Sequence, residues 1–132
     1  MYKVVISDLD GTLLNNQHHV STHTRKILKK MVAEGTKFVV ATGRHHIDVK
    51  AIRDALGLEI YLVTSNGAVV TDKQDQIIFN RTLPEDIAQE LSELPLPDPE
   101  IAVNIYTPDA WYTNKEMPEY LEYRSEERRV GK

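Results

Sequence analysis

Two aspartates stand one residue apart in the stretch SDLDGTLL, residues 7–14. Asp8 and Asp10 directly follow a short apolar run, and because Asp and Gly are poor strand residues, the stretch indicates a loop after a strand. Alternate residues of an extended chain point the same way, so we expect the two carboxylates to converge. Carboxylates that close repel each other unless a cation or a proton lies between them. Oxygen ligands of this kind suit Mg²⁺.

Phosphoryl transfer is the chemistry that such a loop supports. A carboxylate nucleophile, a second carboxyl group acting as acid and base, and a hard cation suit a reaction through an aspartyl-phosphate. Gly11 allows an unusual backbone φ, and Thr12 offers a hydroxyl and a backbone N–H to an anion. Taken alone, these residues leave open the alternative of a plain turn in which an aspartate caps the backbone.

Three predicted strands bring polar residues to one edge of a sheet. We expect strands over residues 3–7, 37–42 and 60–65, separated by helices at 22–35 and 46–57. This order predicts a parallel sheet with right-handed crossovers. The second strand ends in ATGR and the third in TSNG, so small polar residues follow each strand. Open α/β sheets bind their ligands at this edge, where a threonine hydroxyl can hydrogen-bond a phosphate oxygen.

The two predicted helices each have an apolar face and recognisable ends. We expect the first to be capped by Ser21 or Thr22 and to end at Gly35, and the second to end at Gly57. The apolar faces comprise Ile27, Leu28, Met31 and Val32 in the first helix and Ile47, Ala51, Ile52, Ala55 and Leu56 in the second.

The pattern changes after Asn66. Residues 68–80 predict a β-hairpin around a turn at 72–75, and residues 84–94 predict a helix with Pro84 in its first turn. Three prolines within residues 95–99 predict an extended link. The remaining predicted elements are strands at 101–106 and 110–113 and a helix from about 117.

These motifs resemble those of a known superfamily. DLDGTLL followed by FVVATGR resembles the first two motifs of the haloacid dehalogenase (HAD) phosphatases, and TSNGA resembles their Cof-type branch, whose cap domain is inserted after the third strand. The similarity covers residues 1–124 and implies an α/β fold: an incomplete HAD-like Rossmannoid parallel sheet with a partial α+β cap. We therefore expect a core at 1–80, a partial cap at 81–124 and a charged tail at 125–132.

The resemblance also implies roles for individual residues. Asp8 matches the nucleophile and Asp10 the general acid/base, while the Asp8 carboxylate and the Asp10 carbonyl match two Mg²⁺ ligands. The residues expected to bind substrate, from the resemblance or from their own chemistry, are Leu9, Gly11, Thr12, Thr42, Gly43, Arg44, Asn66 and Gly67. Within this set, Thr42 and Gly43 match the phosphate-binding second motif.

Composition narrows the class of protein. The 132 residues include no cysteine, which excludes a disulfide framework and a thiol nucleophile, and a net charge of −4 gives no footprint for nucleic acid or an anionic membrane. We expect a cytoplasmic protein that acts on a small phosphorylated metabolite; the sequence does not indicate its oligomeric state. Residues 38–57 and 104–114 are similar to those of bacterial phosphatases that act on pyridoxal phosphate and sugar phosphates.

The sequence also departs from the family pattern. The lysine motif and the G-D-x-x-N-D motif, which supplies further Mg²⁺ ligands, do not follow Asn66. We expect residues 4–6 to form an unpaired apolar edge and the chain to be truncated and inactive. Residues 125–132 fit either a non-native end or a charged helix end. Other readings are a phosphomutase or a non-catalytic phosphate-binding fragment. A receiver-type signalling domain would carry its phosphoacceptor at the end of the third strand, where Thr64, Ser65 and Asn66 offer none.

Overall fold

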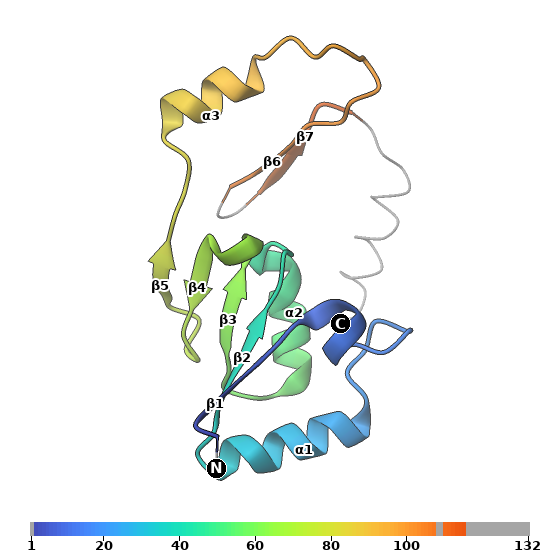
Figure 1. Ribbon diagram of the computed structural model, residues 1–132, viewed down its shortest axis with the longest axis vertical. Coiled ribbons are helices and arrows are strands. Elements are labelled where there is room, and N and C mark those ends of the chain that lie inside the picture. The colour runs from blue at the N-terminus through green and yellow to red at the C-terminus, as the bar shows by residue number, and fades with distance from the viewer. Residues whose placement is uncertain (1, 108–109, 116–132) are drawn as a thin grey trace. The chain divides into compact units, whose positions relative to one another are not determined.

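The structure is a computed structural model that describes residues 2–107 and 110–115. The chain divides into two compact units, Met1–Arg81 (unit 1) and Thr82–Lys132 (unit 2). Unit 1 contains a five-stranded sheet and two helices, and unit 2 contains one helix and a two-stranded sheet (Figure 1). The helix predicted from about residue 117 and the tail at 125–132 lie outside the described residues.

The sheet of unit 1 mixes parallel and antiparallel strands. Its strands, in spatial order, are β1 (Val4–Ser7), β2 (Lys37–Ala41), β3 (Tyr61–Thr64), β4 (Val69–Thr71) and β5 (Ile77–Asn80). β1, β2 and β3 pair in parallel, whereas β4 and β5 join them as an antiparallel hairpin. The predicted α/β class, the parallel β-α-β-α-β unit and the hairpin are confirmed.

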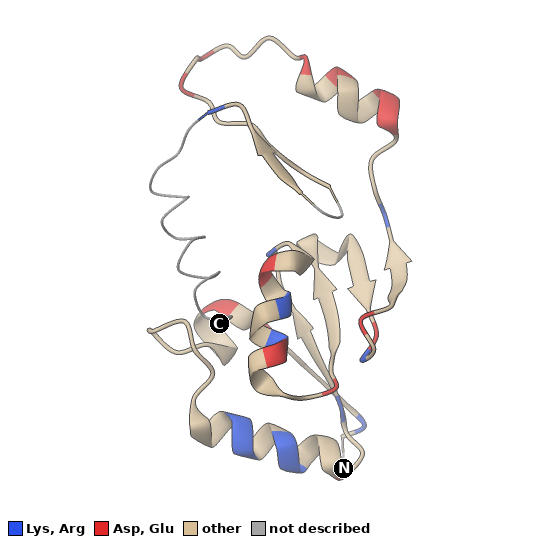
Figure 2. Cartoon of the chain, turned by 180° about the vertical axis from the view of Figure 1, so that it is seen from behind, with Lys and Arg blue, Asp and Glu red and all other residues tan. Residues whose placement is uncertain are grey.

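The helices of unit 1 begin and end where their sequences predict. α1 spans Thr22–Ala33, and the Ser21 hydroxyl caps it by accepting the Thr24 N–H at 3.0 Å. α2 spans His46–Leu56 and ends at Gly57, whose φ of 61° lies in the left-handed region that favours glycine. The lysines of α1 are exposed; Figure 2 colours the basic positions of this helix blue.

Both helices pack on the same face of the sheet. β1, β2 and β3 lie side by side in chain order, so successive right-handed crossovers place α1 and α2 on one side. Figure 2 shows this side. The core between the helices and the sheet comprises Leu9, Leu14, Leu28, Phe38, Val40, Val49, Leu56, Ile60 and Leu62. The core therefore lies directly beneath the strands whose ends carry the predicted site.

The apolar helix faces are narrower than the sequence predicted. Of the residues placed on the apolar faces, Ile27, Ile47, Ala51 and Ala55 are exposed, and Val49, which the prediction omitted, is buried. α2 meets the sheet along Val49, Ile52 and Leu56, a stripe of residues spaced by three and four. Within the described residues, each helix is covered by the sheet along one stripe.

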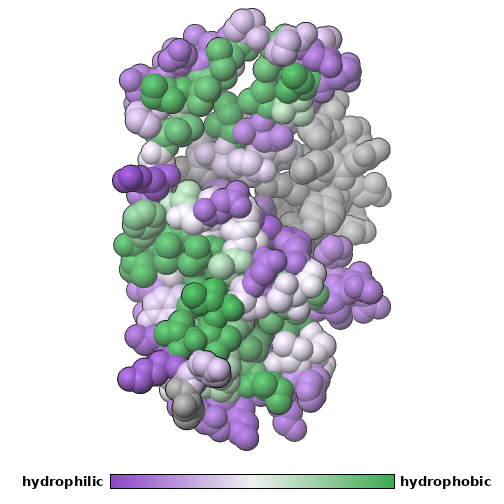
Figure 3. Space-filling model, in the orientation of Figure 1, coloured by the Kyte–Doolittle hydropathy of each residue, from purple (hydrophilic) through white to green (hydrophobic). Residues whose placement is uncertain are grey.

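The apolar strand β1 forms one edge of the sheet, as predicted. Within the described sheet it pairs only with β2. Ile6 is 65% exposed and Val4 is also exposed, because their side chains point away from α1 and α2. At the opposite edge, β5 exposes Ile78 and Phe79, and Figure 3 shows apolar side chains gathered over this part of unit 1.

Unit 2 contains the elements predicted for residues 84–113. α3 spans Glu85–Ser92 directly after Pro84, and β6 (Asn104–Tyr106) pairs antiparallel with β7 (Trp111–Thr113). The Trp111 indole N–H donates to the Asn104 side chain at 3.0 Å across this pair. Across the two units, no helix of the described segments is long and apolar enough to cross a membrane.

Candidate functional site

The loop after β1 exposes two carboxylates, and the side chain of the residue between them is buried in the core. Asp8 has an extended backbone, and its Oδ1 accepts the N–H of Leu9 at 2.7 Å. The Leu9 side chain is fully buried in the core, while Asp8 and Asp10 are exposed. Gly11 has a φ of 69°, so the predicted unusual backbone conformation is confirmed. This stretch therefore forms a turn that is held to the core by the buried Leu9 side chain.

Arg44, from the loop after β2, donates two hydrogen bonds to the Asp10 carboxylate. Its Nε donates to Oδ2 of Asp10 at 2.8 Å and its Nη2 donates to Oδ1 at 2.7 Å. The hydrogen bond from Arg44 lowers the pKa of Asp10 below its ordinary value; partial burial opposes this, and the charges of Arg44 and His18 add to it. The structure thus holds the Asp10 carboxylate in its charged form. No local sequence pattern indicates this pairing, which spans 34 residues.

The loop after β2 is folded back on itself at Thr42. This residue is buried, its N–H donates to the Val63 carbonyl at 2.9 Å, and its hydroxyl oxygen accepts the Arg44 N–H at 3.2 Å. A hydroxyl that accepts one hydrogen bond keeps its own proton to donate. Thr42 therefore shapes the loop and retains the donor that a phosphate oxygen requires.

The loop after β3 has an unusual backbone. Ser65, Asn66 and Gly67 have φ values of 51°, 55° and 93°, so three successive residues lie in the left-handed region. Two backbone bonds tie this turn to the loop after β2: Ser65 N–H donates to the Arg44 carbonyl at 2.8 Å, and Asn66 N–H donates to the Thr42 carbonyl at 3.3 Å. Sequence reasoning placed Asn66 near the site and missed this strained turn, although Asn and Gly tolerate the left-handed region best.

The Asn66 side chain also lies beside Gly43. A Cβ atom added at Gly43 would lie 2.9 Å from Oδ1 of Asn66, closer than a Cβ atom comes to its neighbours. Any residue other than glycine at position 43 would therefore require the end of the Asn66 side chain to shift. The loops after β2 and β3 are interlocked through this contact and the two backbone bonds.

All residues predicted to act in the site lie in the three loops that follow β1, β2 and β3. Direct contacts join Asp10 to Arg44, Arg44 to Thr42, and Gly43 to Asn66. Thr12 and Gly67 lie in the same loops, after β1 and after β3 respectively. Because the strands are parallel, their carboxyl ends meet at one edge of the sheet, and the arrangement gathers carboxylates, a guanidinium, a hydroxyl and backbone N–H groups there.

The site offers oxygen atoms, the type of ligand that a hard cation such as Mg²⁺ prefers. The Asp8 carboxylate and the Asp10 carbonyl are oxygen donors, whereas the Asp10 carboxylate is engaged by Arg44. In residues 2–107 and 110–115 there is no group of three or more His, Asp or Glu side chains that could hold a metal ion. The described chain thus offers part of an octahedral coordination shell.

Comparison with known proteins finds consistent matches. A model of the haloacid dehalogenase-like hydrolase family matches residues 5–131. A Buchnera aphidicola protein that bears the name "Putative phosphatase" is 40% identical over 114 residues, 86% of this chain and 42% of that protein. The HMP-PP phosphatase of Serratia proteamaculans is 35% identical over 121 residues, 92% of this chain and 44% of its own.

The fold is also found among solved structures. A haloacid dehalogenase-like hydrolase from B. subtilis superposes with a TM-score of 0.77 and 32% sequence identity, covering 92% of this chain and 42% of that chain. The chain therefore spans less than half the length of the curated relatives it matches.

Proposed function

Because this chain belongs to the haloacid dehalogenase-like hydrolase family, we propose that it carries the nucleophile and the acid/base of a Mg²⁺-dependent phosphomonoester hydrolase. The observation that supports this best is the loop after β1, in which Asp8 is exposed at the carboxyl end of the strand and Asp10 is oriented by Arg44. We further propose that unit 1 is part of the catalytic core and unit 2 part of a cap.

The reaction proceeds in two steps on these residues. The Asp8 carboxylate attacks phosphorus and the bond to the leaving oxygen breaks. Asp10, whose charged form Arg44 favours, first takes a proton from solvent and then gives it to that oxygen. Asp10 then takes a proton from water, which attacks the aspartyl-phosphate, releases inorganic phosphate and regenerates Asp8. The Asp8 carboxylate and the Asp10 carbonyl would hold Mg²⁺, which would neutralise charge at the phosphoryl oxygens.

The phosphoryl group is held by the interlocked loops. In the proposed complex the Thr42 hydroxyl donates to a phosphoryl oxygen, with the N–H of Gly43 and those of the loop after β1 as further donors. Leu9 N–H, which now donates to Asp8, turns to the phosphate once the Asp8 carboxylate is engaged. Asn66 contributes by keeping the Thr42–Arg44 loop in place.

A small phosphorylated metabolite is the proposed substrate class. The motif resemblance favours pyridoxal phosphate or sugar phosphates, and a relative named HMP-PP phosphatase widens the candidates to that compound. A panel of pyridoxal phosphate, hexose phosphates and HMP-PP, with a nucleotide and a phosphopeptide as controls, tests the class. Preference for the nucleotide or the phosphopeptide would contradict it.

The decisive experiment replaces the nucleophile. In the complete native polypeptide that contains this chain, Asp8→Asn should abolish phosphate release from small phosphomonoesters while circular dichroism stays that of the parent. Turnover of the variant within tenfold of the parent would refute the assignment. In ¹⁸O-labelled water, the parent should release phosphate that carries solvent oxygen, whereas a mutase would return the phosphoryl group to a substrate.

For the 132-residue chain alone we propose negligible turnover. Asp8 and Asp10 supply two protein oxygens to a cation that takes about six, so the metal would be held weakly and positioned poorly. Phosphate release from p-nitrophenyl phosphate in millimolar Mg²⁺, with Asp8→Asn as the blank, measures this. Mg²⁺-dependent turnover well above the blank would show that other residues of the chain complete the site.

A further inference from the structure

We propose that Arg44 is a positioning residue for Asp10, and that the left-handed turn at Ser65 and Asn66 fixes Arg44 in place. This inference rests on the proposed function, because it assigns Asp10 the proton transfer to the leaving group. It concerns how that group is aimed. It gives Arg44 a different task from the substrate contact that its place in the sequence suggested.

The side-chain contact is the first step of the argument. Two parallel N–H···O bonds, at 2.8 Å and 2.7 Å, set both the distance and the plane of the Asp10 carboxylate. The Arg44 side chain is only 13% exposed, whereas that of Asp10 is 46% exposed. Arg44 is therefore the fixed partner, and Asp10 is the partner that faces the solvent where a substrate arrives.

The backbone of Arg44 is held as firmly as its side chain. Its N–H donates to the Thr42 hydroxyl at 3.2 Å, and its carbonyl accepts the Ser65 N–H at 2.8 Å. The Asn66 N–H holds the Thr42 carbonyl at 3.3 Å. The last residues before α2 are thus tied to the loop after β3 at two points, which leaves Arg44 one backbone position from which to reach Asp10.

The strained turn is what makes these bonds possible. Ser65 and Asn66, which are not glycine, have φ values of 51° and 55°. Such conformations persist only where surrounding contacts hold them, and they concentrate at functional sites. Here the turn directs two successive N–H groups at the loop after β2 and packs the Asn66 side chain against Gly43. The contacts therefore run from the end of β3 through Arg44 to Asp10.

Leaving-group dependence tests the proposal in the complete native polypeptide. A p-nitrophenolate leaves without a proton, whereas a primary alkoxide needs one, so in the first step, measured as release of the leaving group in a single turnover, only the alkyl phosphate depends on a well-aimed Asp10. Arg44→Lys should lower this single-turnover rate for a hexose 6-phosphate by about 10- to 100-fold and for p-nitrophenyl phosphate by less than about threefold. Arg53→Gln, which removes an arginine paired with Asp75 outside the site, should leave both rates unchanged.

The variant Asp10→Asn separates this inference from the proposed function. It should show the same selectivity for the alkyl phosphate, with a larger loss. Equal losses on both substrates for Arg44→Lys, or no loss on either, would overturn the inference about Arg44. In that case a selective effect of Asp10→Asn would still support the proposed function. Absence of leaving-group selectivity in Asp10→Asn would overturn the function itself.

A second pair of variants covers the case in which Arg44→Lys does not fold. Ser65→Val places a β-branched residue where φ is 51°, whereas Ser65→Gly accepts that conformation freely. Ser65→Val should reproduce the selective loss on the alkyl phosphate, and Ser65→Gly should lose less. If the two variants behave alike, or if Ser65→Val slows both substrates equally, the turn does not position Asp10 through Arg44.

Discussion

Two arginine–aspartate pairs of unit 1 have nearly the same shortest distance and lie in different parts of that unit. Arg44 and Asp10 approach to 2.7 Å in the loops after β2 and β1, and Arg53 and Asp75 approach to 2.6 Å between α2 and the β4–β5 turn. Both arginines are mostly buried, and both aspartates have a pKa below their ordinary value, chiefly through the hydrogen bond from their arginine.

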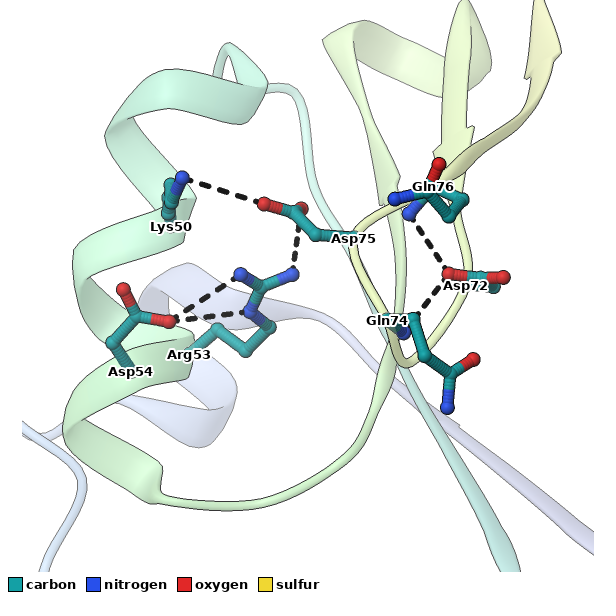
Figure 4. A network of polar contacts seen from close by, with 7 residues as sticks. All are labelled: Lys50, Arg53, Asp54, Asp72, Gln74, Asp75 and Gln76. Atoms are coloured by element: carbon teal, nitrogen blue, oxygen red, sulfur yellow. Dashed lines mark hydrogen bonds and ion pairs between the residues drawn. The ribbon is translucent and has the colours of Figure 1, made fainter.

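The Arg53 pair belongs to a closed network that fastens the hairpin to the helix (Figure 4). Asp75 also pairs with Lys50 at 3.5 Å, and Arg53 also contacts Asp54 on its own helix at 3.3 Å. Within the turn, Asp72 accepts the N–H groups of residues 74 and 76 at 2.9 Å and 2.8 Å. The Asp75 carboxylate therefore pairs with two cations of α2, and the turn that carries it is held by Asp72. We infer that Asp75 has a structural role.

The surroundings of the two aspartates, and not the pair itself, indicate their roles. Asp75 lies at a hairpin turn that packs on a helix, whereas Asp10 lies two residues from the exposed carboxylate of Asp8, at the edge of the sheet where ligands bind. An arginine at the first place stabilises the fold, and on the proposed function an arginine at the second place aims a reactive group. Substitutions in the two pairs should therefore separate stability from activity.

The largest expected separation comes from the two aspartates. Asp10→Asn should lower kcat for phosphomonoesters by about 10²–10⁴-fold, because it removes the proton donor and acceptor. The matched variant Asp75→Asn should leave kcat within about twofold of the parent, since its carboxylate contacts only Arg53 and Lys50 across elements. Steady-state kinetics of both variants in the complete polypeptide measure this. Similar losses would remove the distinction between the pairs.

The next effect concerns the interlocked loops. Gly43→Ala should raise KM by about two- to threefold, because the added Cβ would lie 2.9 Å from Oδ1 of Asn66 and the end of that side chain must shift within the proposed phosphate loop. Adding Asn66→Gly to this variant should recover much of the loss, since glycine removes the obstructing side chain and accepts the φ of 55°. A double variant no better than Gly43→Ala would show that the contact is not what requires glycine.

Much of this site was visible in the sequence, because it depends on local signals. The apolar runs and their polar ends placed Asp8, Asp10 and Thr42 after successive strands, and Gly11 indicated an unusual turn. The pairing of Asp10 with Arg44 was not visible, since no local pattern reports which side chains meet across 34 residues. The strained Ser65 was missed for another reason: serine has no intrinsic preference for φ above zero, so only tertiary contacts reveal it.

The same limit applies to the fold. Helix ends at Ser21 and Gly57 follow from local chemistry and were predicted, whereas the exposure of Ile27 and Ile47 depends on how much of each helix the sheet covers. The hairpin was predicted from its turn residues, but its attachment to α2 through Arg53 was not. Contacts between elements, not the elements themselves, were what the sequence left open.

A smaller effect is expected on stability. Arg53→Gln should lower the free energy of unfolding by about 1 kcal/mol, a value below that of a buried charged hydrogen bond because Asp75 is 35% exposed. For a unit of this size the loss corresponds to about 4–8 °C in Tm. Arg44→Gln should change Tm by less than half as much, because its partner Asp10 is more exposed. Thermal denaturation by circular dichroism compares them, and a larger loss for Arg44→Gln would reverse the assignment.

The smallest effect is the pH dependence of the Arg53 pair. The hydrogen bond from Arg53 holds the pKa of Asp75 below its ordinary value of 3.8 in the folded chain. A carboxyl group whose pKa is depressed by folding contributes stability that is fully present above the unfolded pKa. That contribution is lost as the pH falls through the lower, folded pKa, because protonation then removes the charge that Arg53 binds. The Tm difference between the parent and Asp75→Asn should therefore be constant from pH 7 to about 5 and shrink below the ordinary pKa. A difference that grows on acidification would show that Asp75 is destabilised by its surroundings, and the Arg53 pair would then not be the structural counterpart of the Arg44 pair.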